Sequence, residues 1–102
     1  MSEPTTTPAV EVTDNPEANQ YEARVDGALA GVAQYIRSEG LIAFVHTEVQ
    51  PQFEGRGVAG ALARTSLDAA RAAGTPVLAA CPFYAGWIDR HPAYQDLLHT
   101  EE

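Results

Sequence analysis

Residues 41–81 read LIAFVHTEVQPQFEGRGVAGALARTSLDAARAAGTPVLAAC, and this stretch decides the fold. Its first part, residues 41–49, is rich in β-branched and aromatic side chains and predicts a strand. Small and apolar side chains then recur at helical spacing over residues 57–73, at Val58, Leu62, Ser66, Ala69 and Ala73. Gly74 ends this helix, and the short apolar run at 77–81 predicts a buried central strand. The stretch therefore predicts a strand–helix–strand unit whose two strands run parallel.

The residues before this unit predict an antiparallel meander. Alternating side chains indicate strands at residues 9–14 and 20–26, and residues 28–37 follow as the hairpin partner of the second strand. Asp26-Gly27 is a tight-turn signal between the second and third of these strands, and Glu39-Gly40 marks the next turn.

The residues after the unit predict short helices. Pro82 suits the first turn of a helix that runs through residues 83–90, and residues 93–98 are expected to form a last short helix. Residues 1–8 are expected to form a flexible N-terminal tail, because two prolines interrupt a polar run. The expected architecture is a single α/β domain over residues 9–99 with a mixed sheet, since 102 residues suit one small domain.

The formal net charge is -8, and all six basic residues are arginines. This charge argues against binding to nucleic acid or anionic membranes and suits a cationic partner such as an amine. No stretch approaches the roughly 20 apolar residues that a membrane-spanning helix needs. The single cysteine, Cys81, excludes an intrachain disulfide, and a reducing cytoplasm is its simplest setting. The three histidines are scattered without zinc-site spacing, so no metal is expected.

The segment 52–59, QFEGRGVA, joins the main strand to the main helix and suits a pyrophosphate. Gly55 and Gly57 allow unusual backbone dihedrals and close approach to an anion. Free N–H groups of the first helical turn point toward such an anion, and Arg56 supplies a nearby cation. Glu54 is expected to point to solvent, because it would repel phosphates. The alternative is a helix start whose glycines serve packing only.

The pattern Gln52-x-x-Gly55-x-Gly57 matches the Q/R-x-x-G-x-G/A signature of the GNAT superfamily, the GCN5-related N-acetyltransferases. The chain resembles the small, minimal members of that superfamily, and the resemblance spans residues 9–98. Its further segments are HTEV at 46–49, FEGRG at 53–57, CPF at 81–83 and RHPAY at 90–94. The resemblance implies a GNAT fold without the usual pair of helices between the first two strands. That departure leaves the acceptor open and suggests an open site for an exposed or bulky amine.

The resemblance also implies acetyl-CoA, or CoA, as the cofactor. Strand 41–49 would separate from strand 77–81, and the pantetheine arm would lie in that gap against the backbone around Val49. The pyrophosphate would sit on residues 55–59. The cofactor-binding residues implied in this way are Val49, Gln52, Phe53, Gly55, Arg56, Gly57, Val58, Ala59 and Arg90. For Arg90, a helix end whose cation complements the helix dipole is an equal alternative.

Four side chains are candidates for the chemistry of acetyl transfer. His46 and Glu48 share one face of their strand, where either would take the proton of an amine; a surface or structural role is the alternative. The resemblance places Cys81 at the site. It is either a nucleophile that carries the acetyl group as a thioester or a small buried hydrophobe. The resemblance also makes Tyr84 the candidate general acid, with ordinary core packing as the alternative.

These residues predict an acetyl-CoA-dependent N-acetyltransferase that transfers an acetyl group to an amine acceptor. Two alternatives stay open: a CoA-binding module with little transferase activity, and a small interaction protein whose glycine turn serves packing only. Binding of CoA separates the first two functions from the third, and turnover with an amine separates the enzyme from the binding module. The identity of the acceptor, the acyl-chain preference and the oligomeric state stay open.

Overall fold

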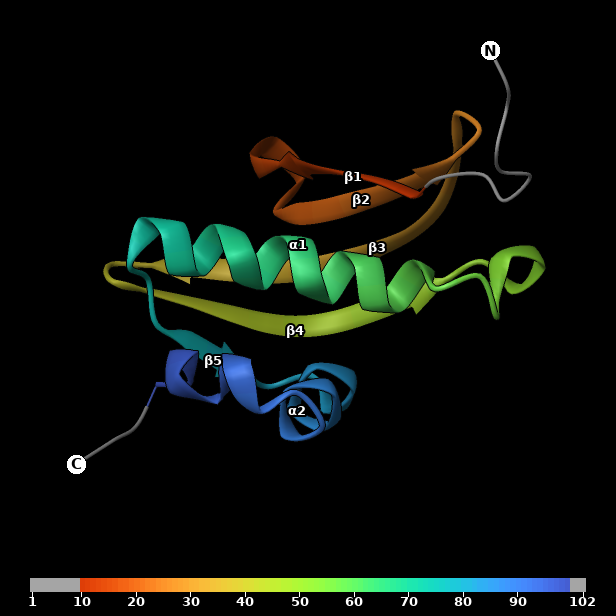
Figure 1. Ribbon diagram of the computed structural model, residues 1–102. Coiled ribbons are helices and arrows are strands. Elements are labelled where there is room, and N and C mark those ends of the chain that lie inside the picture. The colour runs from red at the N-terminus through yellow and green to blue at the C-terminus, as the bar shows by residue number, and fades with distance from the viewer. Residues whose placement is uncertain (1–9, 100–102) are drawn as a thin grey trace, which may run out of the picture.

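The computed structural model describes residues 10–99, so the predicted tail at 1–8 and the first residue of the predicted domain lie outside the described residues. Five strands form one sheet in the order β1-β2-β3-β4-β5 (Figure 1). They are β1 (Val10–Asn15), β2 (Gln20–Val25), β3 (Ala28–Ser38), β4 (Leu41–Val49) and β5 (Val77–Ala79). The first four strands pair antiparallel in sequence order, and β4 pairs with β5 in parallel. The predicted meander and the predicted parallel unit are therefore confirmed.

Two α-helices and three short 3-10 helices complete the described chain. They are α1 (Val58–Ala73), α2 (Pro82–Asp89), η1 (Pro16–Ala18), η2 (Pro51–Phe53) and η3 (Pro92–Leu97). Between β1 and β2 the chain forms η1 alone, so the usual pair of helices is absent there, as expected. Within residues 10–99, no helix combines the length and the apolar character that a membrane crossing requires.

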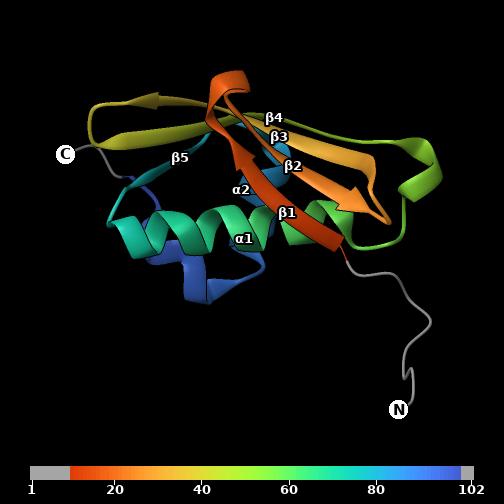
Figure 2. The same ribbon diagram turned by 90° about the horizontal axis from the view of Figure 1, so that it is seen from above.

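Both α-helices pack on the same face of the sheet. The ring of Tyr84 on α2 stacks on Phe44 of β4 with centroids 4.3 Å apart. The Tyr84 hydroxyl also lies 2.8 Å from the hydroxyl of Ser66 on α1, which places α2 on the α1 side. Figure 2 shows the helices together on one side of the sheet. The opposite face of the sheet is therefore left uncovered by the helices that the structure describes.

The core lies between α1 and this covered face of the sheet. Aromatic rings from β2, β3 and α2 surround Phe44, whose side chain is fully buried. On α1 the buried residues are Val58, Leu62, Ala63, Ser66, Leu67 and Ala70. Ala69 and Ala73 share the predicted helical spacing but are exposed, because the buried stripe follows the i, i+4 row to Ala70.

The last strand differs from its prediction in length and in position. β5 ends at Ala79 rather than at residue 81, and it is the edge strand of the sheet rather than a central one. Leu78 is 43% exposed. On its outer side, Val77 bridges to Leu98. The Val77 carbonyl also accepts a hydrogen bond at 2.7 Å from the backbone N–H of His99, two residues beyond η3. The predicted central position was wrong because a short apolar run in the sequence has no periodicity that distinguishes an edge strand from a central one.

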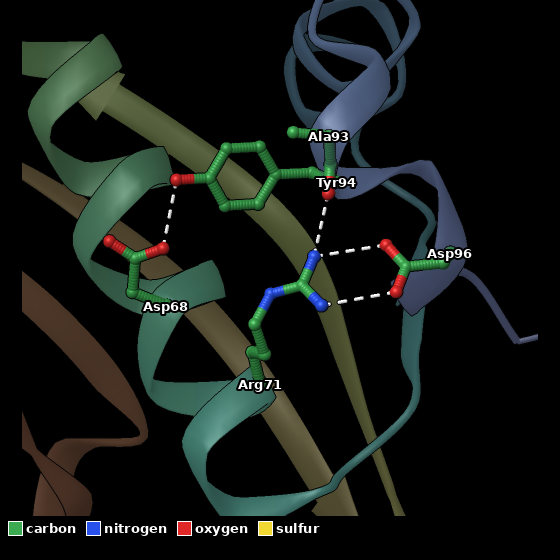
Figure 3. A network of polar contacts seen from close by, with 5 residues as sticks. All are labelled: Asp68, Arg71, Ala93, Tyr94 and Asp96. Carbon is green, nitrogen blue, oxygen red and sulfur yellow. Dashed lines mark hydrogen bonds and ion pairs between the residues drawn. The ribbon is translucent and has the colours of Figure 1, made fainter.

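Polar contacts between α1 and η3 hold the end of the described chain against the helix (Figure 3). Arg71 donates to both carboxylate oxygens of Asp96, at 3.0 and 2.9 Å, and to the carbonyl oxygen of Ala93 at 2.6 Å. The Tyr94 hydroxyl donates to Asp68 at 2.8 Å. Because the Arg71 guanidinium hydrogen-bonds the Asp96 carboxylate, the pKa of Asp96 lies below its ordinary value.

Replacing Arg71 with alanine is expected to loosen η3 with little effect on global stability, because both partners of the ion pair are exposed. The contribution of the pair should be present at neutral pH and lost as the pH falls through the lowered pKa of Asp96. Hydrogen exchange checks this expectation: amides of residues 93–97 should exchange faster in the variant at neutral pH. Below the pKa of Asp96, the difference should shrink to the part that the Arg71 hydrogen bond to the Ala93 carbonyl contributes. Unchanged protection at neutral pH would contradict the role of Arg71.

Candidate active site

β4 and β5 separate after a short paired segment. The pairs are Ile42 with Val77, Ala43 with Leu78 and Phe44 with Ala79. The Cys81 N–H donates to the Phe44 carbonyl at 2.8 Å, and Pro82 then starts α2. Among the described residues, β4 continues to Val49 without a strand partner on this side. We call the gap between residues 45–49 and the start of α2 the fork, and the predicted separation of the two strands is confirmed.

A bulge in β4 sets which side chains enter the fork. The register with β3 steps from Phe44 to His46, so Val45 is an extra residue without a partner on β3. Phe44 points into the core, whereas beyond the bulge Thr47 points to that side and His46 is exposed. The alternation of β4 is therefore reversed between its two ends, and no residue pattern in the strand signals this.

Cys81 lies at the base of the fork. Its side chain is 4% exposed, and its sulfur lies 3.4 Å from the Thr47 hydroxyl. Cys81 is also the N-cap residue of α2, so the positive end of that helix dipole lies beside it and favours negative charge. Sequence reasoning missed Thr47, because strict alternation from Phe44 would turn it away from the core side. Only the bulge at Val45 turns Thr47 toward Cys81.

His46 and Glu48 lie together on the uncovered face of the sheet. Nε2 of His46 is 3.7 Å from a carboxylate oxygen of Glu48, and the two side chains are 53% and 72% exposed. Adjacent residues of a strand point to opposite faces, so Thr47 separates this pair from Cys81. In the described contacts, His46 thus meets Glu48 rather than the sulfur.

Tyr84 points into the core. Its side chain is fully buried on Phe44, and its hydroxyl meets the Ser66 hydroxyl and donates to the Leu62 carbonyl at 3.4 Å. Burial raises the pKa of Tyr84, which opposes loss of its proton. The geometry therefore favours the core-packing alternative over the general-acid role, because the ring reaches from α2 to α1 rather than into the fork.

The glycine turn leads into a helix that no side chain caps. Gly55 and Gly57 have φ of 83° and 79°, in the left-handed region that favours glycine. An added Cβ would meet no atom within 4 Å at either position, so backbone conformation rather than close packing requires glycine here. The first N–H groups of a helix have no intrahelical acceptor. Gly57, the N-cap of α1, makes no side-chain cap bond to them either. Such donors suit an anion.

The other residues of the turn differ in exposure. The exposed side chains of the turn are those of Gln52, Glu54 and Arg56. The Arg56 guanidinium lies 5.8 Å from the ring centroid of Phe53, which packs against the core. Val58 is 2% exposed, so its backbone rather than its side chain is available to a ligand, and Ala59 is half-buried beside it.

Arg90 lies at the opposite end of α2 from the fork. It is the exposed C-cap residue of α2, and its guanidinium lies close to Gly86, where an added Cβ would be 3.4 Å from it. No described contact links Arg90 to the glycine turn. Trp87 borders the first turn of α1 instead, because its indole nitrogen lies 3.7 Å from the position of a Cβ on Gly60. Trp87 is otherwise buried in the core, at 5% exposure.

Comparison with known proteins agrees with this fold. The family profile of GCN5-related N-acetyl-transferases matches residues 20–97, which is more than half of the chain, so the chain belongs to this family. Family membership supports acetyl transfer in general. Among solved structures, the chain is similar to a GCN5-like protein from Staphylococcus aureus, solved by NMR, at a TM-score of 0.67 and 19% identity. That similarity covers 96% of this chain and 94% of the other.

Two further structures share the fold over 81% of this chain. One is a ribosomal-protein-alanine N-acetyltransferase from Brucella melitensis biovar Abortus 2308, at a TM-score of 0.54 and 22% identity. The other is AAC(6')-Iy in complex with the bisubstrate analogue CoA-S-monomethyl-acetylneamine, at a TM-score of 0.50 and 21% identity. The chain spans 62% and 63% of their lengths, so both contain parts without a counterpart here. No curated protein matches the sequence.

Proposed function

We propose that this protein is an acetyl-CoA-dependent N-acetyltransferase that acetylates an amine. One observation carries the proposal: the fork opens at the end of β4 that leads into the glycine turn and the uncapped start of α1 (Figure 1). A pantetheine arm along the unpaired edge of β4 would place its pyrophosphate near the α1 donors. The CoA-containing ligand of the AAC(6')-Iy complex supports CoA as the cofactor.

The backbone of this region provides the donors that would hold the cofactor. Gln50 donates its N–H to a carbonyl of β3 at 2.8 Å, so the alternation of β4 turns the N–H of Val49 toward the fork. The N–H groups of Val58 and Ala59 would meet the pyrophosphate, with Arg56 as the local cation. Because the net charge is -8, these local donors must act against an unfavourable global field.

Cys81 and the His46–Glu48 pair lie on the two sides of the fork. Acetyl-CoA supplies an activated acetyl thioester. Cys81 accepts the acetyl group on its sulfur while its thiol proton passes to the departing sulfur. The amine then takes the acetyl group, and the Cys81 sulfur departs as a thiolate. The exposed His46–Glu48 pair takes the proton that the amine releases, and the thiolate regains a proton from solvent. The Thr47 hydroxyl, 3.4 Å from that sulfur, supports its transient negative charge.

Calorimetric titration with acetyl-CoA tests the cofactor. The wild-type protein should bind saturably, and Gly57→Trp should weaken binding at least about a hundredfold, because a large side chain would cover the start of α1. Gly40→Trp is the matched control: Gly40 has φ of 75° and equally open surroundings, but it lies in the β3–β4 turn. An absence of binding at millimolar ligand, or equal losses in the two variants, would sink the proposal.

The second candidate function is a CoA-binding module, and the distance of His46 from Cys81 favours it. A turnover assay distinguishes the enzyme from this module. Amine-dependent release of CoA supports the enzyme. Saturable binding of acetyl-CoA without amine-dependent release supports the binding module instead.

A further inference from the structure

An apolar row crosses the uncovered face of the sheet. Ile36 pairs with Ala43, and Ala43 pairs with Leu78, so their side chains line up over β3, β4 and β5. Val45 lies on the same face beside the row, since it follows the core residue Phe44. Ile36, Val45 and Leu78 are 59%, 37% and 43% exposed. We call Ile36, Ala43, Val45 and Leu78 the apolar row; exposed apolar side chains that lie together rather than singly are a feature of docking surfaces.

The apolar row ends at the fork. The pair Ala43–Leu78 comes directly before Phe44–Ala79, where the pairing of β4 with β5 ends. His46 and Glu48 follow on the same face, beyond the bulge. A molecule that covers the row therefore reaches the fork from the face opposite α1.

Charge selects among the candidate occupants of this surface. Two exposed carboxylates flank the row: Glu39 lies in the turn after β3, and Glu48 lies beyond the bulge. The whole chain carries a net charge of -8, so docking two copies face to face would bring like charges together. A basic segment with apolar side chains matches both the row and its flanks. A free polyamine matches the carboxylates and leaves the row uncovered.

We infer that the apolar row is the docking surface for the acceptor, and that the acceptor is a basic protein segment with apolar side chains. Its amine, a lysine side chain or a chain N-terminus, enters the fork past His46 and Glu48. The open face suits such a segment, since the described chain has no α-helices between β1 and β2 that would wall off a small-molecule pocket. This inference rests on the proposed acetyltransferase function and adds its substrate class.

Binding of a fluorescently labelled peptide of alternating valine and lysine tests the surface. The double variant Ile36→Lys/Leu78→Lys should bind this peptide about tenfold more weakly than the wild type, because it removes apolar contacts and adds repulsion. The double variant Thr65→Lys/Ala72→Lys is the matched control, since it adds the same charge at exposed positions of α1. The control should bind within about twofold of the wild type. All four replaced side chains are exposed, so both variants should fold, which thermal unfolding checks.

Three results would overturn the inference. They are equal weakening in the two double variants, displacement of the peptide by spermidine as readily as by unlabelled peptide, and a wild-type dimer in sedimentation that the Ile36→Lys/Leu78→Lys variant loses. Acetyl-CoA binding is measured separately. A protein that binds acetyl-CoA but not the peptide overturns the docking surface alone. A protein that binds the peptide but not acetyl-CoA overturns the proposed function, and with it the role of the segment as acceptor, while the docking surface stands.

Discussion

Replacing Cys81 with alanine is expected to lower amine-dependent turnover by about 10³-fold or more, while acetyl-CoA affinity stays within about threefold. The loss should be large because the proposed route passes the acetyl group through this sulfur. Affinity should be preserved because the proposed cofactor donors are backbone N–H groups of β4 and α1, which the substitution leaves in place. The fold should also be preserved, since Cys81 makes no side-chain cap bond to α2.

Mass spectrometry of the protein with acetyl-CoA, in the absence of an amine, checks the same prediction directly. The wild type should gain one acetyl group on the peptide that contains Cys81, and Cys81→Ala should gain none there. The chain has no lysine, so the N-terminal amine is the one competing amine acceptor, and it lies on a different peptide. Full turnover in Cys81→Ala would show that the amine attacks the cofactor directly and would remove the covalent role.

Replacing Gly31 with alanine is expected to lower the free energy of unfolding by about 3 kcal/mol. An added Cβ would lie 2.8 Å from the backbone oxygen of Glu48 and 3.0 Å from a methyl carbon of Val58. The first contact involves backbone, which cannot rotate away as a side chain would. The clash therefore has to separate β3 from β4 or displace the start of α1. Chemical unfolding with urea measures the loss.

The matched control for this prediction is Gly86→Ala. Gly86 lies inside α2, where an added Cβ would be 3.4 Å from the flexible end of Arg90. The same methyl group should there be neutral or stabilising by up to about 1 kcal/mol, because alanine favours a helix. Since Glu48 and Val58 flank the entrance to the proposed cofactor site, Gly31→Ala should also weaken acetyl-CoA binding. Wild-type stability in Gly31→Ala would show that the sheet absorbs the methyl group and would contradict both expectations.

Much of the fold was predictable because it depends on neighbours in the sequence. The alternation that defines β4 acts over two residues and the period of α1 over four, and both elements lie within one residue of their predicted bounds. The left-handed backbone of Gly55 and Gly57 is equally local, since it follows from the missing Cβ. The tight turn at Asp26-Gly27 and the stop of α1 at Gly74 have the same origin.

The arrangement of the candidate site was less predictable because it depends on contacts between distant segments. His46, Glu48 and Cys81 were identified by residue type and resemblance, but no local pattern says that Thr47, rather than His46, approaches the sulfur. That outcome comes from the extra residue Val45, which is defined by the β3 register. Register is a cross-strand property, and one residue of slip exchanges the two faces.

By itself, the sequence determined the order of the elements, the parallel β4–β5 unit and the glycine turn, because sterics and hydrophobic periodicity act within each segment. The tertiary structure alone decided that β5 is an edge strand, that Tyr84 reaches α1 inside the core and that the apolar row faces solvent. These features depend on which face of the sheet the helices cover. The helices cover the face that buries the largest apolar surface of the whole chain. This total area depends on all segments together, so no single segment of the sequence determines it.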